Sequence, residues 1–287
     1  MTNRSTLARR LGPWVWLVFA TTGCERTDAE SVAHAAAHAQ ALVEIAKGDF
    51  GEVRRGLPGG AQEIAKRWKD EADPLTEPDS ARRLLDIARS KTVDLSVSKS
   101  TFFALASPEG VIIRNDREQD LMAGKSIFAA FPALAAGPHD GYTEVLGSFA
   151  EAHGVKGKPD AEWIAVQGVN VDGATRALFV TGWAWSRYSY RLEFVLRGKA
   201  KDEVKNSGGN VPLLYAFVLV GSDVYSAPES PEVNERAIAE IAPLDHLDAN
   251  GSFSKLVSIT GRTFALGVQL APDVGPKVGI GVLRSEI

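Results

Sequence analysis

Cysteine is almost absent from this chain: among 287 residues only one, Cys24, is present. The fold therefore contains no internal disulfide, and an apolar core has to stabilise it even in an oxidising compartment. Catalytic motifs are missing as well, including Gly-x-Ser-x-Gly, His-Glu-x-x-His, a phosphate-binding glycine-rich loop and Cys-x-x-Cys-His for haem. We therefore predict no catalytic residue and no cofactor, with a hydrolase whose site is not visible in one sequence as a weaker alternative.

Histidine is also scarce, and its five copies are scattered along the chain. His34 and His38 are spaced as i and i+4, which on a helix places both rings on one face, where they could hold a metal ion. A stable site would need further ligands, and the nearest acidic residues are Asp28, Glu30 and Glu44. We interpret both histidines as solvated residues of a helix surface and expect no metal. The remaining histidines are His139, His153 and His246.

The chain has no excess of positive charge, since 32 Lys and Arg stand against 36 Asp and Glu, a formal net charge of −4 at pH 7. Phosphate backbones repel such a protein, so we expect no nucleic acid among its partners. Apolar residues make up 45% of the chain, which is enough for a large core. Beyond the amino terminus there is no apolar run of about 18 residues, so no transmembrane helix is predicted there.

The amino terminus has the layout of a secretion signal. Three arginines precede an apolar segment, residues 11–20, which is too short to span a bilayer, and Thr21-Thr22-Gly23-Cys24 follows. This layout resembles the bacterial lipoprotein signal, in which the cysteine is lipidated and becomes the first residue after cleavage. The chain departs from that pattern at Thr21, where leucine is favoured. The resemblance implies a signal peptide over residues 1–23 and lipidation of Cys24.

Such processing would leave 29 basic and 36 acidic residues, a net charge of about −7. Anionic lipids do not attract a chain of this charge, so its membrane contact would depend on the acyl chains at Cys24. We predict an extracytoplasmic location on the bacterial membrane, and Glu25 after the cysteine is compatible with delivery to the outer membrane. The alternatives are an ordinary secreted protein with a free thiol and an uncleaved amino-terminal anchor.

The periodicity of the remaining chain predicts an α+β protein that begins with a helical stalk over residues 24–100. Apolar residues recur at helical spacing over residues 32–47, and Gly48 is expected to end this first helix. A second, short helix is expected over residues 60–69. After the prolines of the next segment, Asp79 or Ser80 would cap a third helix. This region would serve as stalk and as packing surface.

After Ser100 the apolar residues alternate, which is typical of strands. The turn Ser107-Pro108-Glu109-Gly110 joins the first two strands, and a helix is expected over residues 118–134. We define a first module as residues 101–205, ending in a connecting helix over residues 186–205. Its predicted strands are residues 102–107, 111–114, 142–150, 163–171 and 175–185.

The same order of elements returns in a second, smaller module, residues 206–287. Phe102-Phe103-Ala104-Leu105 in the first module corresponds to Leu214-Tyr215-Ala216-Phe217 in the second, which suggests an internal repeat of about 110 residues. Pro231 is placed where a first helical turn accepts proline, so a helix is expected over residues 233–241. The predicted strands are residues 213–220, 224–226, 252–259, 263–270 and 278–283.

Two consecutive units of five antiparallel strands, each with a helix after the second strand, resemble the PAS-like modules of extracytoplasmic Cache sensors. The resemblance covers residues 101–287, and its best local piece is residues 102–123, where two paired strands lead through Arg114-Asn115-Asp116 into the expected helix. It implies a sensor fold in which Arg114 and Asp116 border the mouth of a ligand cavity. An exposed ion pair or a turn-stabilising aspartate would explain these two residues equally well.

The chain departs from that family in two ways. Most Cache sensors continue into a membrane-spanning helix and a cytoplasmic transmitter, whereas here no such segment follows the second module, so a separate membrane protein would have to carry the signal. In addition, amino-acid-binding members display an arginine followed closely by a Trp-Tyr pair, and no such cluster follows the first module's helix. The resemblance therefore does not support amino-acid sensing.

Aromatic and cationic residues are densest in Trp183-Ala184-Trp185-Ser186-Arg187-Tyr188. On a strand, Trp183 and Trp185 would share a face and form an apolar wall with Arg187 at its rim, beside Trp163 on the neighbouring strand. Such a wall could border a ligand cavity or pack between the sheet and a helix. The candidate ligand-binding residues are Arg114, Asp116, Phe128, Trp163, Trp183, Trp185 and Arg187.

We therefore predict a lipid-anchored extracytoplasmic protein that binds a small molecule or an envelope partner without catalysis, its state being read by a membrane signalling protein. The alternative is a structural or assembly lipoprotein of the cell envelope with no ligand pocket. The two hypotheses differ at Trp163, Trp183 and Phe128. These rings would line an enclosed pocket in the first case and would be packed solid in the second.

Overall fold

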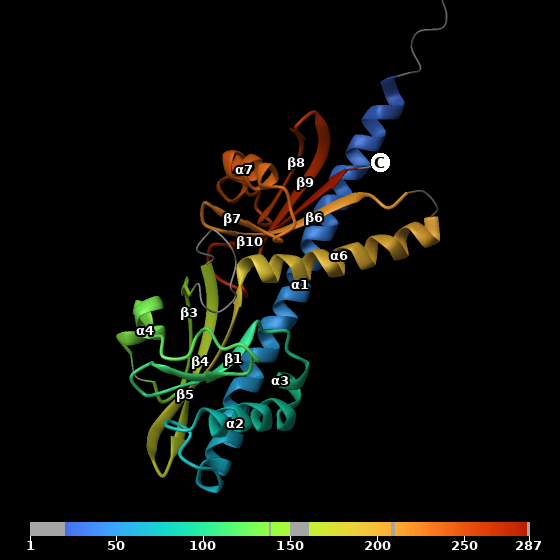
Figure 1. The fold of residues 1–287 in the computed structure, drawn as a ribbon. Coiled ribbons are helices and arrows are strands. Elements are labelled where there is room, and N and C mark those ends of the chain that lie inside the picture. Colours follow the sequence, from blue (N-terminus) through green and yellow to red (C-terminus); the bar gives the residue numbers. More distant parts are fainter. Residues whose placement is uncertain (1–20, 138, 150–160, 208–209, 286–287) are drawn as a thin grey trace, which may run out of the picture.

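The computed structural model describes residues 21–137, 139–149, 161–207 and 210–285. Within them, one long helix, α1 (Thr21–Arg67), leads into two five-stranded antiparallel sheets. In Figure 1, α1 runs past both sheets, with the second sheet toward its amino-terminal end and the first toward its carboxyl-terminal end. This is the α+β architecture that the sequence predicts. Residues 1–20 of the expected signal peptide and the side chain of Cys24 lie outside the described residues.

Helix α1 is one helix of 47 residues, whereas the sequence pattern predicts two helices here. The predicted end at Gly48 is wrong because the apolar stripe of the helix continues past it. Burying that stripe outweighs the cost of a helical glycine, about 1 kcal/mol relative to alanine, and of Pro58 inside the helix. The fully buried residues of the stripe are Leu42, Ala46, Phe50, Val53, Leu57 and Ile64.

Two helices pack beside the carboxyl-terminal half of α1. They are α2 (Pro78–Lys91) and α3 (Val93–Val97), and they follow a short 3₁₀ turn, η1 (Trp68–Asp70). Glu77 precedes α2 at the N-cap position and Pro78 opens the helix, so the predicted cap at Asp79 or Ser80 is wrong by two or three residues. Gly60 of α1 allows α3 to pack close to α1, because a Cβ at position 60 would lie 2.6 Å from the Leu95 side chain of α3.

The first sheet has the strand order β2-β1-β5-β4-β3, and all its pairs are antiparallel. Its strands agree with the predicted ranges to within two residues. The turn between the last two strands places Asp172 at φ 54° and Gly173 at φ 81°, the left-handed conformations that a tight hairpin requires. The strands are β1 (Phe102–Ala106), β2 (Ile112–Asn115), β3 (Tyr142–Ser148), β4 (Ala161–Val171) and β5 (Ala174–Ala184).

The helix expected over residues 118–134 is largely absent. Two single turns, α4 (Ile127–Ala130) and α5 (Pro132–Ala135), are its only helical parts among the described residues. The residues before α4 form a loop because the Asp120 carboxylate satisfies backbone donors that a helix would otherwise use. The amides that donate to Asp120, at 2.8–3.0 Å, belong to Asn115, Met122 and Ala123.

The second sheet repeats the strand arrangement of the first. Its strand order, β7-β6-β10-β9-β8, is the same second-first-fifth-fourth-third order, and α6 (Trp185–Ser207) connects the two sheets. The later elements are β6 (Leu213–Val220), β7 (Asp223–Ser226), α7 (Glu232–Ile241), η3 (Pro243–Asp245), β8 (Ser252–Ile259), β9 (Arg262–Leu270) and β10 (Val278–Ser285).

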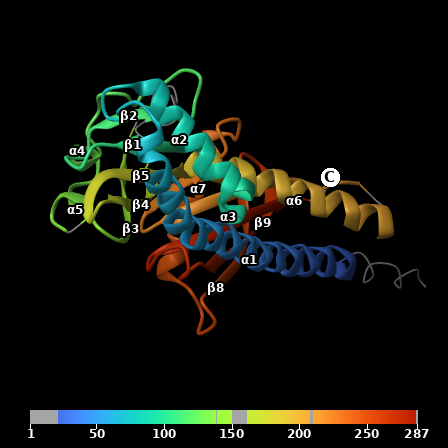
Figure 2. The ribbon, with the colours of Figure 1, turned by 90° about the horizontal axis from the view of Figure 1, so that it is seen from below.

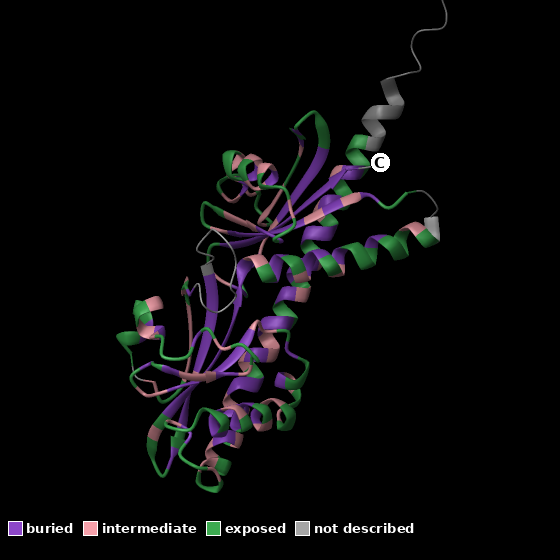
Figure 3. Cartoon of the chain, viewed as in Figure 1, coloured by how far each residue is buried: buried purple, intermediate pink, exposed green. Residues whose placement is uncertain are grey.

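One apolar core runs between α1 and both sheets, and each sheet has a smaller core on its opposite face. The burial pattern in Figure 3 shows the main core as the buried strip that follows α1. The helix lies directly on β9, because a Cβ at Gly267 would stand 2.4 Å from the backbone carbon of Ala35. The predicted helical region therefore supplies one side of the protein's main core.

Candidate functional site

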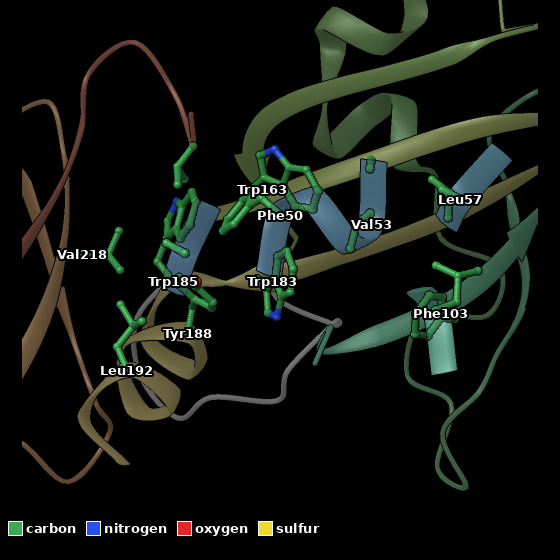
Figure 4. Packing of buried hydrophobic residues seen from close by; sticks show 14 of the residues in the cluster. Phe50, Val53, Leu57, Phe103, Trp163, Trp183, Trp185, Tyr188, Leu192 and Val218 are labelled. Carbon is green, nitrogen blue, oxygen red and sulfur yellow. The ribbon is translucent and has the colours of Figure 1, made fainter. Parts of the chain in front are cut away.

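The predicted aromatic wall exists, and it faces α1. The Phe50 ring packs against both strand tryptophans, with its centroid 4.6 Å from Trp163 and 4.6 Å from Trp183, and the two indoles stack on each other at 5.3 Å (Figure 4). Trp185 is the first residue of α6, although the sequence pattern predicts it at the end of the strand, and it is fully buried beside the Phe50 ring. The three tryptophans belong to the main core. They pack between the sheet and a helix and do not border a ligand cavity.

A half-buried polar cluster lies at the edge of this core. The Glu144 carboxylate on β3 accepts two hydrogen bonds from the Arg54 guanidinium, at 2.6 and 2.8 Å, one from Tyr142 Oη at 2.7 Å and one from Trp163 Nε1 at 3.2 Å. Burial alone would raise the pKa of Glu144, but these donors outweigh it and lower the pKa. Burial and the neighbouring carboxylate raise the pKa of Tyr142. The cluster fixes the edge strand β3 to α1.

A second polar cluster lies where β5 passes directly into α6. Arg191 donates two hydrogen bonds to the Asp49 carboxylate of α1, from Nε at 2.8 Å and from Nη2 at 2.6 Å. Tyr188 Oη donates to the same carboxylate at 3.1 Å. Burial, together with the nearby Asp49 charge, raises the pKa of Tyr188. The hydrogen bond from Arg191 to Asp49 raises the pKa of that guanidinium. These contacts hold the connecting helix against α1.

Arg114 and Asp116 are both engaged in local structure. Asp116 Oδ2 accepts a hydrogen bond from Arg89 at 2.8 Å, and its Oδ1 accepts from the Phe103 amide at 2.9 Å. Arg114 contacts Asp120 at 3.2 Å and also donates to backbone oxygens of the loop that follows β2. Arg114 therefore stabilises that loop, whereas Asp116 connects the end of β2 to β1 and α2.

The structure does not bring the remaining two candidates to the tryptophans. Phe128 packs with the small core on the opposite face of the first sheet, its ring stacked on His139 at 4.7 Å. Arg187 is exposed on α6. The seven candidate residues therefore belong to three separate places: the main core, the loop after β2 with its neighbouring small core, and the surface of α6.

The two histidines of α1 differ in their surroundings. His38 is only 6% exposed, and its Nε2 lies 3.0 Å from Glu203 Oε1 near the end of α6, so the interpretation of His38 as a solvated residue is wrong. Burial lowers the pKa of His38, although the Glu203 contact opposes this effect. In the part of the chain that the structure describes, no group of three or more His, Cys, Asp or Glu side chains is arranged to hold a metal ion.

A cavity of about 300 Å³ lies in the second module, between the sheet and the α7–η3 segment. It is on the sheet face opposite α1, because Leu219 and Ile238 of its lining belong to the small core of that face. Other apolar parts of the lining are Val224 and Leu270, and the polar side chains at its edge are Ser222, Asp245 and Lys277.

The cavity depends on how α7 ends. Ala242 takes the left-handed conformation, φ 48° and ψ 55°, which turns the chain out of α7 into η3 at Pro243. Such a conformation is uncommon for a residue with a Cβ, so sequence reasoning did not foresee it. The proline directly after the helix was the one available signal of a sharp turn. No residue of this lining is among the seven sequence-based candidates.

No protein-family model and no curated protein sequence matches this chain. Several solved structures share its fold at 11–12% identity. They include a domain of a putative sensory box/GGDEF family protein from Vibrio parahaemolyticus (TM-score 0.55, 11% identity, 91% of this chain and 97% of that one) and the extracellular domain of the putative histidine kinase vpHK1S-Z8 (TM-score 0.56, 11%, 92% and 93%).

A third is the ligand-binding domain of the Pseudomonas fluorescens chemoreceptor CtaA in complex with L-leucine (TM-score 0.51, 12% identity, 91% of this chain and 97% of that one). At this identity the likeness shows the fold alone. Among the described residues, no helix has the length and apolar character needed to cross a bilayer. The chain has the fold of Cache/PAS-like sensor domains, a long amino-terminal helix followed by two five-stranded antiparallel sheets.

Proposed function

We propose that this chain is an extracytoplasmic sensor or binding domain that recognises a small molecule without catalysis, and that the cavity of the second module is its ligand site. The cavity is the observation that carries the proposal, because it combines an apolar lining with a few polar groups at its edge. The fold supports it, since one structure that shares this fold is a chemoreceptor ligand-binding domain in complex with L-leucine.

The size and lining of the cavity define the class of ligand. A volume of about 300 Å³ is at the lower end of the range for small-molecule sites. Leu219, Val224 and Leu270 offer contacts to an apolar body, whereas Asp245 and Lys277 offer one charge of each sign. We expect a small organic molecule with an apolar part and a charged head group.

Occupancy of the cavity can reach α1 through the sheet. The η3 turn lies against β10, since a Cβ at Gly279 would stand 2.7 Å from Leu244 Cδ2. On its other face β10 contributes Val278, Ile280 and Val282 to the core that contains α1. A ligand that favours one position of η3 would therefore bias the packing of β10 on α1, and a separate membrane protein would read the change.

A thermal-shift screen of the purified chain tests the ligand site. Organic acids, amines, purines and sugars are the first classes to examine, and a ligand at one hundred times its Kd should stabilise the chain by about 2.7 kcal/mol. Ala239→Trp should abolish the shift, because Ala239 is exposed on α7 and lines the cavity. The matched control is Ala33→Trp, on the exposed side of α1.

Two results would count against the proposal. A ligand shift that survives Ala239→Trp would move the site elsewhere. If no compound class raises the melting temperature, the alternative function, a structural or assembly lipoprotein of the cell envelope, becomes the better hypothesis. The packed state of Trp163 and Trp183 already favours that alternative for the first module.

We also propose that Cys24 carries the lipid that attaches the chain to the bacterial membrane. The support is the sequence layout before Cys24, with three arginines, a short apolar segment and a small residue at position 23. Cys24→Ser should move the chain from the membrane fraction to the soluble fraction of cells. Firm membrane association of that variant would contradict lipid anchoring.

A further inference from the structure

The solvent side of α6 carries a row of residues that the proposed ligand site does not use. Phe194 is 72% exposed and Tyr190 is 48% exposed, although both are aromatic. Four cations lie in the same row and are also exposed. The row, spaced three or four residues apart along the helix, is Arg187, Tyr190, Phe194, Arg197, Lys201 and Lys205.

The α6 row occupies a narrow strip of the helix surface, and every charged residue in it is positive. At about 100° per residue, its six side chains fall within an arc of about 80° around the helix axis, and no acidic residue between positions 187 and 205 falls inside that arc. Two of the cations contact acids on the flanks, Arg197 with Glu193 at 2.5 Å and Lys205 with Asp202 at 3.5 Å. The chain as a whole carries a formal charge of −4, so this helix face is a local positive surface on an acidic protein.

The opposite side of α6 holds the helix rigidly in place. Leu192 and Leu196 are fully buried in the main core. Ser189 Oγ donates to the Tyr225 carbonyl at 2.8 Å and accepts from the Val218 amide at 3.2 Å, which fixes the helix to two strands of the second sheet. The exposed aromatic rings are therefore presented on a fixed scaffold, which reduces the entropy lost when a partner binds.

We propose that this α6 row is a docking surface for a protein partner whose facing surface is acidic and has an apolar recess for Phe194. Exposed aromatic residues next to arginines are the side chains most enriched at the centres of protein interfaces. The four cations would attract and orient an acidic surface, and burial of the Phe194 ring would add the apolar contribution.

Charge and position argue against two other occupants. A second copy docked through the same face would place these cations opposite the same cations, which is repulsive. A membrane is disfavoured by distance from the proposed lipid site, because Glu203 contacts His38 and Arg191 binds Asp49, which places α6 beside positions 14 to 25 residues beyond Cys24 on α1, or about 21 to 37 Å along the axis. Figure 2 shows α6 running beside the amino-terminal half of α1, and in Figure 1 the amino-terminal end of α1 extends upward past the level of α6.

Binding to a defined acidic polymer tests the chemistry of the row. The experiment uses the full chain and a fluorescein-labelled random copolymer of glutamate and tyrosine, with fluorescence anisotropy at about 50 and 200 mM NaCl. We expect Phe194→Ala to weaken binding about tenfold and Arg187→Glu with Lys201→Glu to weaken it more, with the salt dependence reduced. The matched control is Lys255→Glu, an exposed cation on β8, which should leave the Kd unchanged.

A photo-crosslinking amino acid at position 194 tests the same surface in cells. We expect one discrete protein adduct that disappears with Arg187→Glu and Lys201→Glu and that is absent when the crosslinker stands at position 255. Equal weakening by Lys255→Glu, or a crosslink to lipid with tighter binding to phosphatidylglycerol vesicles than to the copolymer, would overturn the proposal. Folding of each variant is checked by its melting temperature, which exposed substitutions should leave nearly unchanged.

Discussion

Replacing Phe50 with alanine decides whether the tryptophans of the first sheet are packed core. Phe50 is fully buried, and its ring centroid lies 4.6 Å from Trp163, 4.6 Å from Trp183, 5.4 Å from Tyr188 and 6.1 Å from Trp185. A buried Phe→Ala change typically destabilises a protein by about 3–5 kcal/mol. Because four aromatic contacts disappear together, we expect the upper part of that range, about 4–5 kcal/mol.

Urea unfolding of the purified chain, followed by tryptophan fluorescence, measures the loss. Three of the six tryptophans lie in this cluster, so the signal reports on the place that is changed. For a domain of this size each kcal/mol lowers the melting temperature by about 2–4 °C, so a thermal scan should show a decrease of about 8–20 °C. The matched control is Phe194→Ala, an exposed phenylalanine, which should change stability by less than about 0.5 kcal/mol.

A small effect would refute the reasoning. If Phe50→Ala cost less than about 1.5 kcal/mol, the Phe50 ring could not be packed tightly against Trp163 and Trp183. In that case the tryptophans would border a void, and the aromatic wall would return as a candidate ligand site in place of the second module's cavity.

Three further predictions concern the contacts that hold α1 and α6. Gly267→Ala should lower the melting temperature markedly, because the new Cβ would lie 2.4 Å from the Ala35 backbone and α1 would have to move away from β9. Ser189→Ala should cost about 1–2 kcal/mol in urea unfolding, since two hydrogen bonds between α6 and the second sheet are lost; an unchanged midpoint would contradict this. The pKa of Glu144 is lower in the folded than in the unfolded chain. The ionised Glu144 carboxylate therefore stabilises the fold above the unfolded pKa of about 4.3, and this stabilisation is lost as the pH falls through the folded pKa. The melting temperature of Glu144→Gln should therefore fall less than that of the wild type between about pH 7 and pH 3, and parallel curves would contradict the assignment.

Local patterns in the sequence were sufficient for the sheets. Strand alternation has a period of two and depends on nearest neighbours, so β6 and β8 coincide with the predicted residues and other strands differ by one or two. The turn from Ser107 to Gly110 was also predicted, and a hydrogen bond from the Gly110 amide to the Ser107 carbonyl closes it at 2.9 Å. The repeated element order followed from the same patterns and indicated the sensor-like fold.

Local rules failed where a distant contact or a side chain competed with them. Gly48 was expected to end a helix on propensity, yet burial of the apolar stripe against two sheets keeps α1 continuous through Gly48 and Pro58. The expected helix after β2 gave way to a loop because Asp120 accepts its backbone donors. His38 was predicted to be a surface residue, but the end of α6, distant in the sequence, covers it in the structure.

The sequence alone determined that two units with the same succession of strands follow a long helical segment, because hydrophobic periodicity depends only on residues close together in the chain. Tertiary structure decided which face of each sheet meets α1, and so placed Trp163 and Trp183 in the core rather than in a cavity. It also created the second module's cavity through the left-handed turn at Ala242. Alternation tells which side chains share a face, but only the packing of distant segments tells what that face touches.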